Sequence, residues 1–119
     1  MLTRNMARPA PTASPEHRIL AAVRAVSCGQ VASYGAIARR AGLPGRARLV
    51  ARILGQNDDP ALPWHRILRA DGRIAFPPDA PGFAEQARRL VAEGVAVRSG
   101  RVRLPAEPED VDAAVWGPR

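Results

Sequence analysis

The sequence predicts a mainly α-helical domain with small β-hairpins, in which two of the helices form a helix-turn-helix. Apolar residues recur at helical spacing in four segments of the chain. The second and third of these segments are separated by a short turn that contains Gly and Pro, which is typical of a helix-turn-helix. Two Gly-centred turns, Asp71-Gly72 and Ser99-Gly100, are flanked by short β-prone runs and indicate hairpins.

The first helix has clear start signals. Ser14 is a favourable N-cap, Pro15 fits the first helical position, and Glu16 places an acidic residue in the first turn. We expect this helix to end near Ser27, because Gly29 follows. Its predicted inward face consists of Ile19, Leu20, Val23 and Val26.

The expected helix-turn-helix lies between residues 33 and 56. Ser33 can cap its first helix, which runs from about Tyr34 until Gly42 and Pro44 stop it. Its second helix lies between Gly45 and Gln56. The predicted inward residues are Ile37, Ala38 and Ala41 in the first helix, and Leu49, Val50, Ile53 and Leu54 in the second.

The second half of the chain predicts two hairpins and a fourth helix. Ile67-Leu68 and the segment 74–76 flank Asp71-Gly72 as the first hairpin, and residues 77–82 are too rich in Pro for a regular element. A helix then continues until Gly94, and the last hairpin joins residues 95–97 to residues 101–104. The predicted inward residues of that helix are Ala84, Ala87, Leu90 and Val91.

The composition indicates one domain with an anionic partner. Residues 1–14 carry Pro and small polar residues without hydrophobic periodicity, so we expect a flexible Pro-rich tail followed by a single domain at residues 15–119. The formal net charge is +7, and all 18 basic residues are arginine. Because the guanidinium group binds phosphate as a planar fork and stacks on bases, nucleic acid is the leading partner class.

The cysteine count and the hydropathy pattern indicate the cellular compartment of the protein. Cys28 is the single cysteine, which excludes an internal disulfide and favours the cytoplasm. We expect neither export nor membrane insertion, because no apolar run has the length of a membrane span or of a secretory signal. The sequence contains no metal-ligand spacing, and it predicts no cofactor.

The most informative stretch is Pro63-Trp64-His65-Arg66, in which Pro63 restricts the backbone that presents the three side chains. This stretch resembles the Pro-Cys-His-Arg active-site motif of O6-alkylguanine-DNA alkyltransferases, with tryptophan in place of the reactive cysteine. In this substitution the sequence resembles the alkyltransferase-like proteins, which lack the reactive cysteine. The blocks at residues 29–35, 47–50 and 90–95 resemble the same family in order and spacing, and the likeness covers roughly residues 16–118.

The resemblance implies a winged helix-turn-helix-like domain, similar to the C-terminal domain of these enzymes, that binds the DNA minor groove and flips a damaged nucleotide outward. It implies that Tyr34 presses on the phosphate beside the target nucleotide and that Arg48 enters the base stack as a finger. Ala47 fits a close approach of its helix to the groove floor. Arg46 and Arg52 complete the predicted DNA-binding set.

The implied lesion pocket consists of Tyr34, Pro63, Trp64 and His65. His65 and Glu93 resemble the proton relay that serves the family's cysteine. Because an indole is only a hydrogen-bond donor and almost non-nucleophilic, no catalytic residue is predicted. His65, Arg66 and Glu93 are then interpreted as a hydrogen-bonded brace for the loop.

Together these features predict a monomeric, non-enzymatic sensor of O6-alkylguanine in double-stranded DNA. The resemblance implies a signal to nucleotide excision repair proteins. We expect the protein in the cytoplasm, associated with the nucleoid when it is bound to DNA.

Two alternatives are weighed against the sensor. Cys28 could serve as another acceptor in an active alkyltransferase, although no base of the motif stands beside it in the sequence. Residues 33–56 could instead be an ordinary major-groove reader of a regulator. Against the second alternative, the third predicted helix offers no Asn or Gln to read adenine before Gln56.

Overall fold

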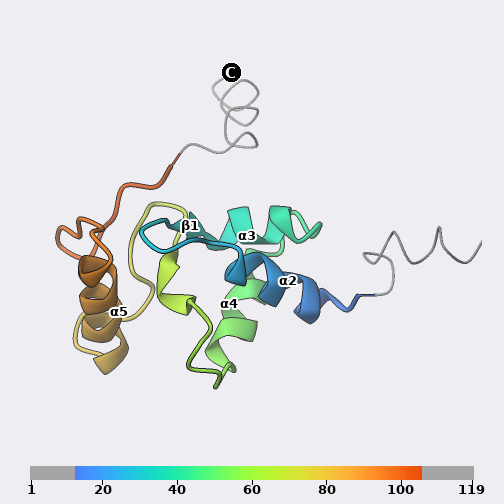
Figure 1. The fold of residues 1–119 in the computed structure, drawn as a ribbon, viewed down its shortest axis with the longest axis horizontal. Coiled ribbons are helices and arrows are strands. Elements are labelled where there is room, and N and C mark those ends of the chain that lie inside the picture. The colour runs from blue at the N-terminus through green and yellow to red at the C-terminus, as the bar shows by residue number, and fades with distance from the viewer. Residues whose placement is uncertain (1–12, 106–119) are drawn as a thin grey trace, which may run out of the picture.

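The computed structural model describes residues 13–105, so the predicted tail at residues 1–14 lies almost entirely outside the described residues. The predicted fold class is confirmed, since the described chain is mainly helical with very little β structure (Figure 1). Its elements are α2 (Pro15–Arg24), β1 (Ala32–Ser33), α3 (Tyr34–Arg40), α4 (Ala47–Gly55), the 3₁₀ helix η2 (Trp64–Arg66), β2 (Ile67–Leu68) and α5 (Pro81–Ala92).

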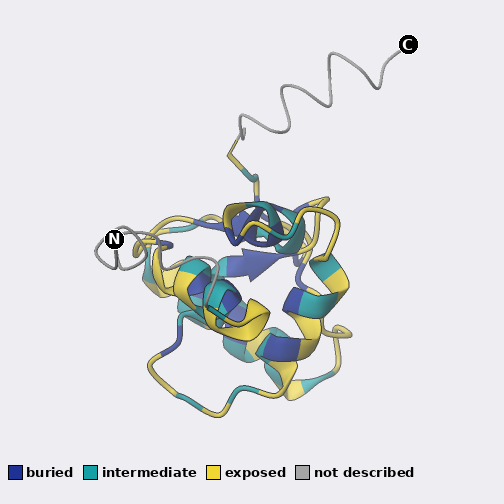
Figure 2. Cartoon of the chain, turned by 90° about the vertical axis from the view of Figure 1, so that its right-hand side faces the viewer, coloured by how far each residue is buried: buried dark blue, intermediate teal, exposed yellow. Residues whose placement is uncertain are grey.

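Helices α2, α3 and α4 pack together, and α5 lies on the opposite side of the two short strands (Figure 1). The strands pair in parallel, with Ala32 opposite Ile67 and Ser33 opposite Leu68. Because successive strand residues point to opposite faces, Ile67 is buried in the helical core and Leu68 in a second core beneath α5. In Figure 2 the strand between these two layers is coloured as buried.

The N-terminal helix starts as predicted and ends earlier than predicted. The Ser14 hydroxyl accepts a hydrogen bond from the His17 amide at 3.0 Å. Helix α2 ends at Arg24, three residues before Ser27, because the Val26 amide bonds to the Val23 carbonyl in a tighter turn. Val26 is nevertheless buried, as its predicted inward position requires.

The helix-turn-helix is confirmed as α3 and α4. The Ser33 hydroxyl accepts a hydrogen bond from the Ala36 amide at 3.0 Å and caps α3. Gly42 and Gly45, in the turn between the helices, have φ angles of 78° and 83° that side chains rarely adopt. Ile37 of α3 and Val50 of α4 are fully buried in the core that both helices share.

The first predicted hairpin is wrong in its pairing. A turn does form at Asp71-Gly72, where the Arg69 amide bonds to the Arg73 carbonyl at 2.9 Å. However, Ile67-Leu68 pairs with β1 rather than with the segment that follows the turn. A parallel pair needs a long crossover connection, and the helix-turn-helix supplies it.

The last predicted hairpin is confirmed only in its turn, because the Val102 amide bonds to the Gly72 carbonyl and residues 95–97 form no strand with residues 101–104. Arg98 and Arg101 exchange both backbone hydrogen bonds at 2.9 Å, across Ser99 and Gly100 with φ angles of 51° and 75°. The segment before Ile74 pairs with the same region, since the Ile74 amide bonds to the Gly100 carbonyl. The turn therefore joins three segments of backbone.

Helix α5 differs from its prediction in its start and in its inward face. It begins at Pro81, inside the segment expected to be a loop, because proline fits the first helical position. Ala84 is exposed and Val91 is 60% exposed, so neither faces the core. The buried or packed residues of this helix are instead Phe83, Gln86, Ala87 and Leu90.

Within residues 13–105, no helix has both the length and the apolar character that a membrane crossing requires.

Candidate functional site

The loop before Trp64 is held by its own short-range hydrogen bonds. The Asn57 side chain accepts from the Asp59 amide and donates to the Asp59 carbonyl, both at 3.1 Å. The Asp59 carboxylate accepts from the Ala61 amide at 2.9 Å. Leu62, 1% exposed, then anchors the loop in the helical core. The backbone that leads into η2 at Trp64 therefore has little conformational freedom.

The indole of Trp64 is half-buried and contacts three side chains. Phe76 and His65 meet it edge-on, with ring centroids 6.0 and 6.1 Å away. The Arg89 guanidinium lies 5.5 Å from the ring centroid in a cation–π contact. Arg89 is itself held by Glu85, whose carboxylate accepts from Nε at 2.6 Å. The i,i+4 spacing of Glu85 and Arg89 indicates their ion pair in the sequence, whereas nothing in the sequence indicates the contact between Arg89 and Trp64.

A cavity of about 580 Å³ lies beside Trp64, within the size range of small-molecule sites. Tyr34 and Trp64 line it, whereas the other two predicted pocket residues, Pro63 and His65, do not. Its other lining residues are Ala51, Leu54, Gly55, Asn57, Asp58, Asp59, Pro60, Ala75, Phe76 and Pro77. The walls are therefore mostly apolar or aromatic, with hydrogen-bond acceptors grouped on the loop after α4.

Such a cavity suits a flat group that is apolar on its faces and donates hydrogen bonds at one edge. Burial raises the pKa of Tyr34, and the charge of Arg69 opposes that rise. The phenol therefore stays neutral near pH 7 and remains a hydrogen-bond donor. The neutral phenol of Tyr34 does not repel an approaching anion, whereas a phenolate would.

Glu93 brings the predicted brace residues together directly after α5. Its Oε2 lies 2.8 Å from His65 Nε2 and accepts from Arg66 Nη2 at 2.7 Å. Its Oε1 accepts from Arg66 Nε at 3.0 Å and from the Gly29 amide at 3.3 Å. Arg66 also donates to the Val26 carbonyl at 2.8 Å. The guanidinium and the carboxylate thus form the bidentate pair that arginine favours.

The electrostatic effect of this pairing is strong. The Arg66 hydrogen bonds, aided by His65 and the Gly29 amide, outweigh burial and lower the pKa of Glu93 from 4.5 to about 2. The hydrogen bond to Glu93 in turn raises the pKa of Arg66. Both groups are charged at neutral pH, so the loop is held by an ion pair that is mostly shielded from solvent.

Gln86 supports the same loop from α5, and sequence reasoning missed it. Its side chain is 1% exposed, and Nε2 donates to the carbonyls of His65 and Ile67 at 2.9 and 3.0 Å. These bonds connect the middle of α5 to η2 and to the start of β2. A polar residue on the inward face of a helix was the available signal.

The predicted DNA-binding residues occupy the outer side of α4. Arg46, Arg48 and Arg52 are exposed, and Ala47 at the first helical position is half-buried. None of these four residues lines the cavity, although α4 contributes Ala51, Leu54 and Gly55 to its wall. Ala51 and Gly55 are exposed and follow Arg48 at i+3 and i+7, so the arginines and the cavity wall lie on neighbouring parts of the same exposed helix face.

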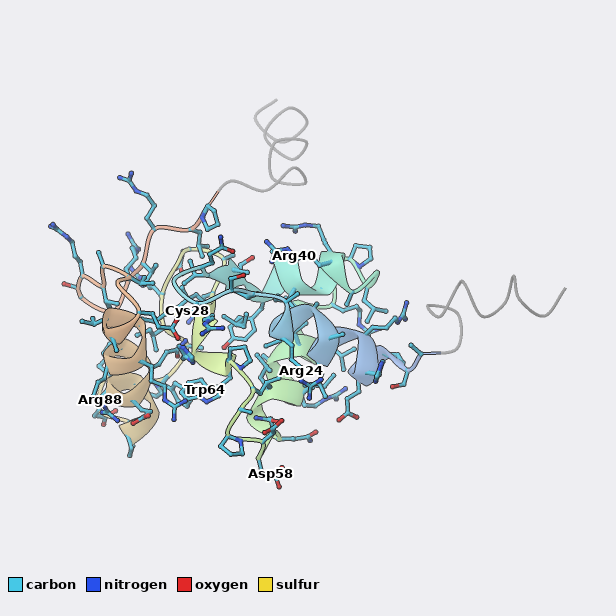
Figure 3. All side chains as sticks on the ribbon, viewed as in Figure 1. Arg24, Cys28, Arg40, Asp58, Trp64 and Arg88 are labelled. Carbon is cyan, nitrogen blue, oxygen red and sulfur yellow. The ribbon has the colours of Figure 1, made fainter. Side chains whose placement is uncertain are left out.

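Cys28 is exposed and does not line the cavity. It lies near the Arg66 guanidinium. Figure 3 shows Cys28 and Trp64 at separate positions. The cavity that Trp64 walls therefore contains no thiol from this residue.

A helix-turn-helix with exposed arginines, beside a cavity with aromatic walls, is typical of a DNA-binding protein. Residues 14–95 match the family model described as 6-O-methylguanine DNA methyltransferase, DNA binding domain. The chain belongs to this family, so the resemblance that the motifs indicated is confirmed.

The similar proteins include members named for base flipping. The DNA base-flipping protein of Vibrio parahaemolyticus is 35% identical over 89 residues, which are 73% of this chain and 87% of that protein. Alkyltransferase-like protein 1 of Schizosaccharomyces pombe is 33% identical over 81 residues, covering 67% and 75% of the two chains. The crystal structure of S. pombe Atl1 with damaged DNA containing O6-carboxymethylguanine superposes with a TM-score of 0.68 at 30% identity, covering 76% of this chain and 88% of Atl1.

The lowered pKa of Glu93 predicts a pH dependence of stability. Because the folded-state pKa, about 2, lies below the ordinary 4.5, the contribution is present above pH 4.5 and is lost as pH falls towards 2. It amounts to about 3 kcal/mol. Glu93→Gln should therefore lower the unfolding free energy at pH 6 and should lose most of that difference near pH 2.5, measured by urea denaturation at both pH values.

Glu85→Gln is the matched control, because its carboxylate pairs with arginines at the surface, where such pairs contribute little. Stability curves of wild type and Glu93→Gln that stay parallel from pH 6 to pH 2.5 would contradict the assignment.

Proposed function

We propose that this protein is a sensor of O6-alkylguanine in double-stranded DNA, which it binds through the minor groove. It rotates the alkylated nucleotide into the cavity between Tyr34 and Trp64 and leaves the alkyl group in place. The observation that carries this proposal is the position of Trp64. By the motif resemblance Trp64 stands where the family has its nucleophile, and it lines a cavity of about 580 Å³ whose wall also includes residues of α4.

The cavity chemistry supports a purine as its occupant. A purine has apolar faces and edges, and because the planes of Trp64 and Phe76 stand at 78° to each other, one ring can stack on a face while the other contacts the purine by dispersion. Guanine carries an N2 amino donor, and the cavity offers acceptor oxygens on Asn57, Asp58 and Asp59. The aromatic walls also suit an O6-alkyl group, which prefers an apolar surrounding.

The outward rotation needs energy that α3 and α4 can supply. Extruding a paired base costs a few kcal/mol in lost stacking and pairing. Tyr34 stands at the first position of α3 and at the cavity wall, so its phenol can press on the backbone of the rotating nucleotide. Arg48 is exposed near the start of α4, where its guanidinium can fill the gap in the stack.

The side chains around Trp64 support binding without alkyl transfer. An indole lacks the thiolate that attacks an alkyl carbon. Glu93 accepts hydrogen bonds from His65 and Arg66 and so serves the loop rather than a nucleophile. The names of the similar proteins, DNA base-flipping protein and alkyltransferase-like protein, agree with a non-enzymatic member of the family.

A bound lesion that stays alkylated must be passed to another activity. We therefore propose that the complex directs nucleotide excision repair proteins to the site, with the protein acting as a monomer on the cytoplasmic nucleoid. The support for this step is chemical: binding protects the lesion without repairing it, so the function is complete only with a repair partner.

Preference for the lesion is the central expected result. A duplex with one O6-methylguanine should bind more tightly than the same duplex unmodified, by about 1–3 kcal/mol, the range for a good base contact. Fluorescence anisotropy of labelled duplexes measures both affinities. Trp64→Ala should reduce the preference because it removes the cavity wall, and equal affinities for wild type would favour a generic DNA-binding module.

Arg48→Ala should weaken lesion binding in duplex DNA by about 1–3 kcal/mol and much less in single-stranded DNA. The single strand has no stack to refill, so only a phosphate contact would be lost there. Arg52→Ala is the matched control, because it removes another exposed arginine from the same helix. If Arg48→Ala costs as much on the single strand as on the duplex, the finger assignment is wrong.

Incubation with O6-methylguanine DNA should leave the mass of the protein unchanged, because the cavity wall presents an indole where the family has its thiolate. Intact-protein mass spectrometry, with an active alkyltransferase of the family as positive control, makes this measurement. A gain of one methyl group, mapped by peptide digestion to Cys28 or any other residue, would overturn the non-enzymatic assignment.

A further inference from the structure

A second groove, of about 860 Å³, adjoins the cavity on the side away from α4. The two share Ala75, Phe76 and Pro77 in their walls. Among its twelve lining residues, four are arginine and none is acidic. These arginines are Arg69, Arg73, Arg98 and Arg101, and all four are exposed. We call this surface the arginine groove.

The backbone sets three of these arginines side by side. Arg101 pairs with Arg73 and with Arg98 in antiparallel bridges, and directly paired residues project from the same face. The pair with Arg73 is of the closely spaced kind, because the flanking amides of Ile74 and Val102 make the hydrogen bonds. The side chains of these three arginines therefore start from neighbouring positions on one face of the ribbon.

The turn that carries this arrangement has little freedom to relax. A Cβ at Gly100 would lie 2.7 Å from the Phe83 ring, so the turn is packed directly on α5. In Figure 1 this turn is the orange segment beside α5. The arginines are thus fixed at their bases by the core beneath α5.

Like charges placed directly opposite one another destabilise a β pair. The groove contains no carboxylate, and the neighbouring Asp71 makes only a 3.7 Å ion pair with Arg73, with both side chains about half exposed. Its pKa is lowered by the Arg73 amide and by the charges of Arg73, Arg69 and Arg101. The charge of Asp71 interacts with three of the four arginines, so positive charge exceeds negative charge among these residues in the free protein.

We propose that the arginine groove binds the phosphate backbone of the DNA strand that flanks the flipped nucleotide. This inference rests on the proposed function, since the strand must enter the cavity beside the groove. Phe76 and Pro77 form the wall common to both, so a chain of phosphates leaving the cavity passes directly over the arginines. The cavity then lies between two basic surfaces, α4 on one side and the arginine groove on the other.

Phosphate is the anion that this surface fits best. A guanidinium group binds phosphate oxygens as a planar two-pronged donor. Evenly repeated phosphates can occupy several arginines at once, whereas a single small anion would satisfy one or two. Contacts of this kind fix the position of the duplex and carry no sequence information.

Arg101→Gln tests the groove, because Arg101 is the central residue of the ribbon. We expect its affinity for lesion and unmodified duplexes to fall by the same factor, on the order of tenfold, with the preference for the lesion unchanged. The log-log salt slope should become shallower by about 0.9, the loss of one neutralised phosphate. Anisotropy titrations between about 50 and 200 mM salt measure both quantities.

Arg88→Gln is the matched control, since Arg88 is exposed on α5 and lines neither the cavity nor the groove. It should leave the slope and both affinities unchanged. Arg101→Lys should retain most of the slope, because it retains the charge. The melting temperature of the free protein should rise by a few degrees in Arg101→Gln as repulsion is relieved, whereas a structural role would lower it.

The outcomes separate the two proposals. If the wild-type protein binds both duplexes equally and the log-log salt slope still becomes shallower in Arg101→Gln, the sensor function is overturned and the groove is supported. A retained lesion preference with an unchanged slope in both Arg101→Gln and Arg98→Gln would overturn the groove alone. The Arg98 variant repeats the test on the other side of the turn, should Arg101→Gln fold poorly.

Discussion

The ion pair between Glu93 and Arg66 is the interaction on which the geometry around Trp64 depends. Glu93 reaches back over 28 residues to His65 and over 64 residues to the Gly29 amide, so three segments meet at one carboxylate. Each of these bonds favours the ionised form and lowers the pKa of Glu93, which offsets the cost of burying charge. The position of the indole is thereby set by charges that lie behind it.

Under the proposed function, this arrangement lets a scaffold of the methyltransferase DNA-binding family serve recognition alone. The motif residues next to the nucleophile position remain hydrogen-bonded, and Gln86 holds two carbonyls of the same loop from α5. Trp64 then occupies a fixed place between Phe76, His65 and Arg89. A preorganised aromatic wall binds a flat ligand with little further loss of conformational freedom.

Acidic and basic side chains lie on different surfaces of the molecule. The cavity wall contains Asp58 and Asp59 and no arginine, so it disfavours a phosphate and suits the donor edge of a base. Exposed arginines stand on α4 and along the arginine groove, and both of these border the cavity. A strand that passes across both surfaces can place its phosphates on arginine and one base in the cavity between them.

The sequence by itself determined the features that depend on neighbouring residues. These are the caps at Ser14 and Ser33, the helix-turn-helix, the turn at Ser99-Gly100 and the motif that identified the family. Cap and turn signals act within a few residues, so they can be recognised in the chain alone. The residues at the cavity could be predicted in part, because the motif pointed to Tyr34 and Trp64 but also to Pro63 and His65, which lie outside it.

Only the tertiary structure decided the contacts between distant segments. Ile67-Leu68 pairs with β1 across the whole helix-turn-helix, and the same two residues would suit a local hairpin equally well by pattern. The inward face of α5 includes Gln86 rather than Ala84, because two carbonyls of the Trp64 loop lie within reach of its amide. Arg89 meets Trp64, and Arg101 meets Arg73, for the same reason. Such pairings depend on which segments pack together, and hydrophobic spacing along one segment carries no information about its partner.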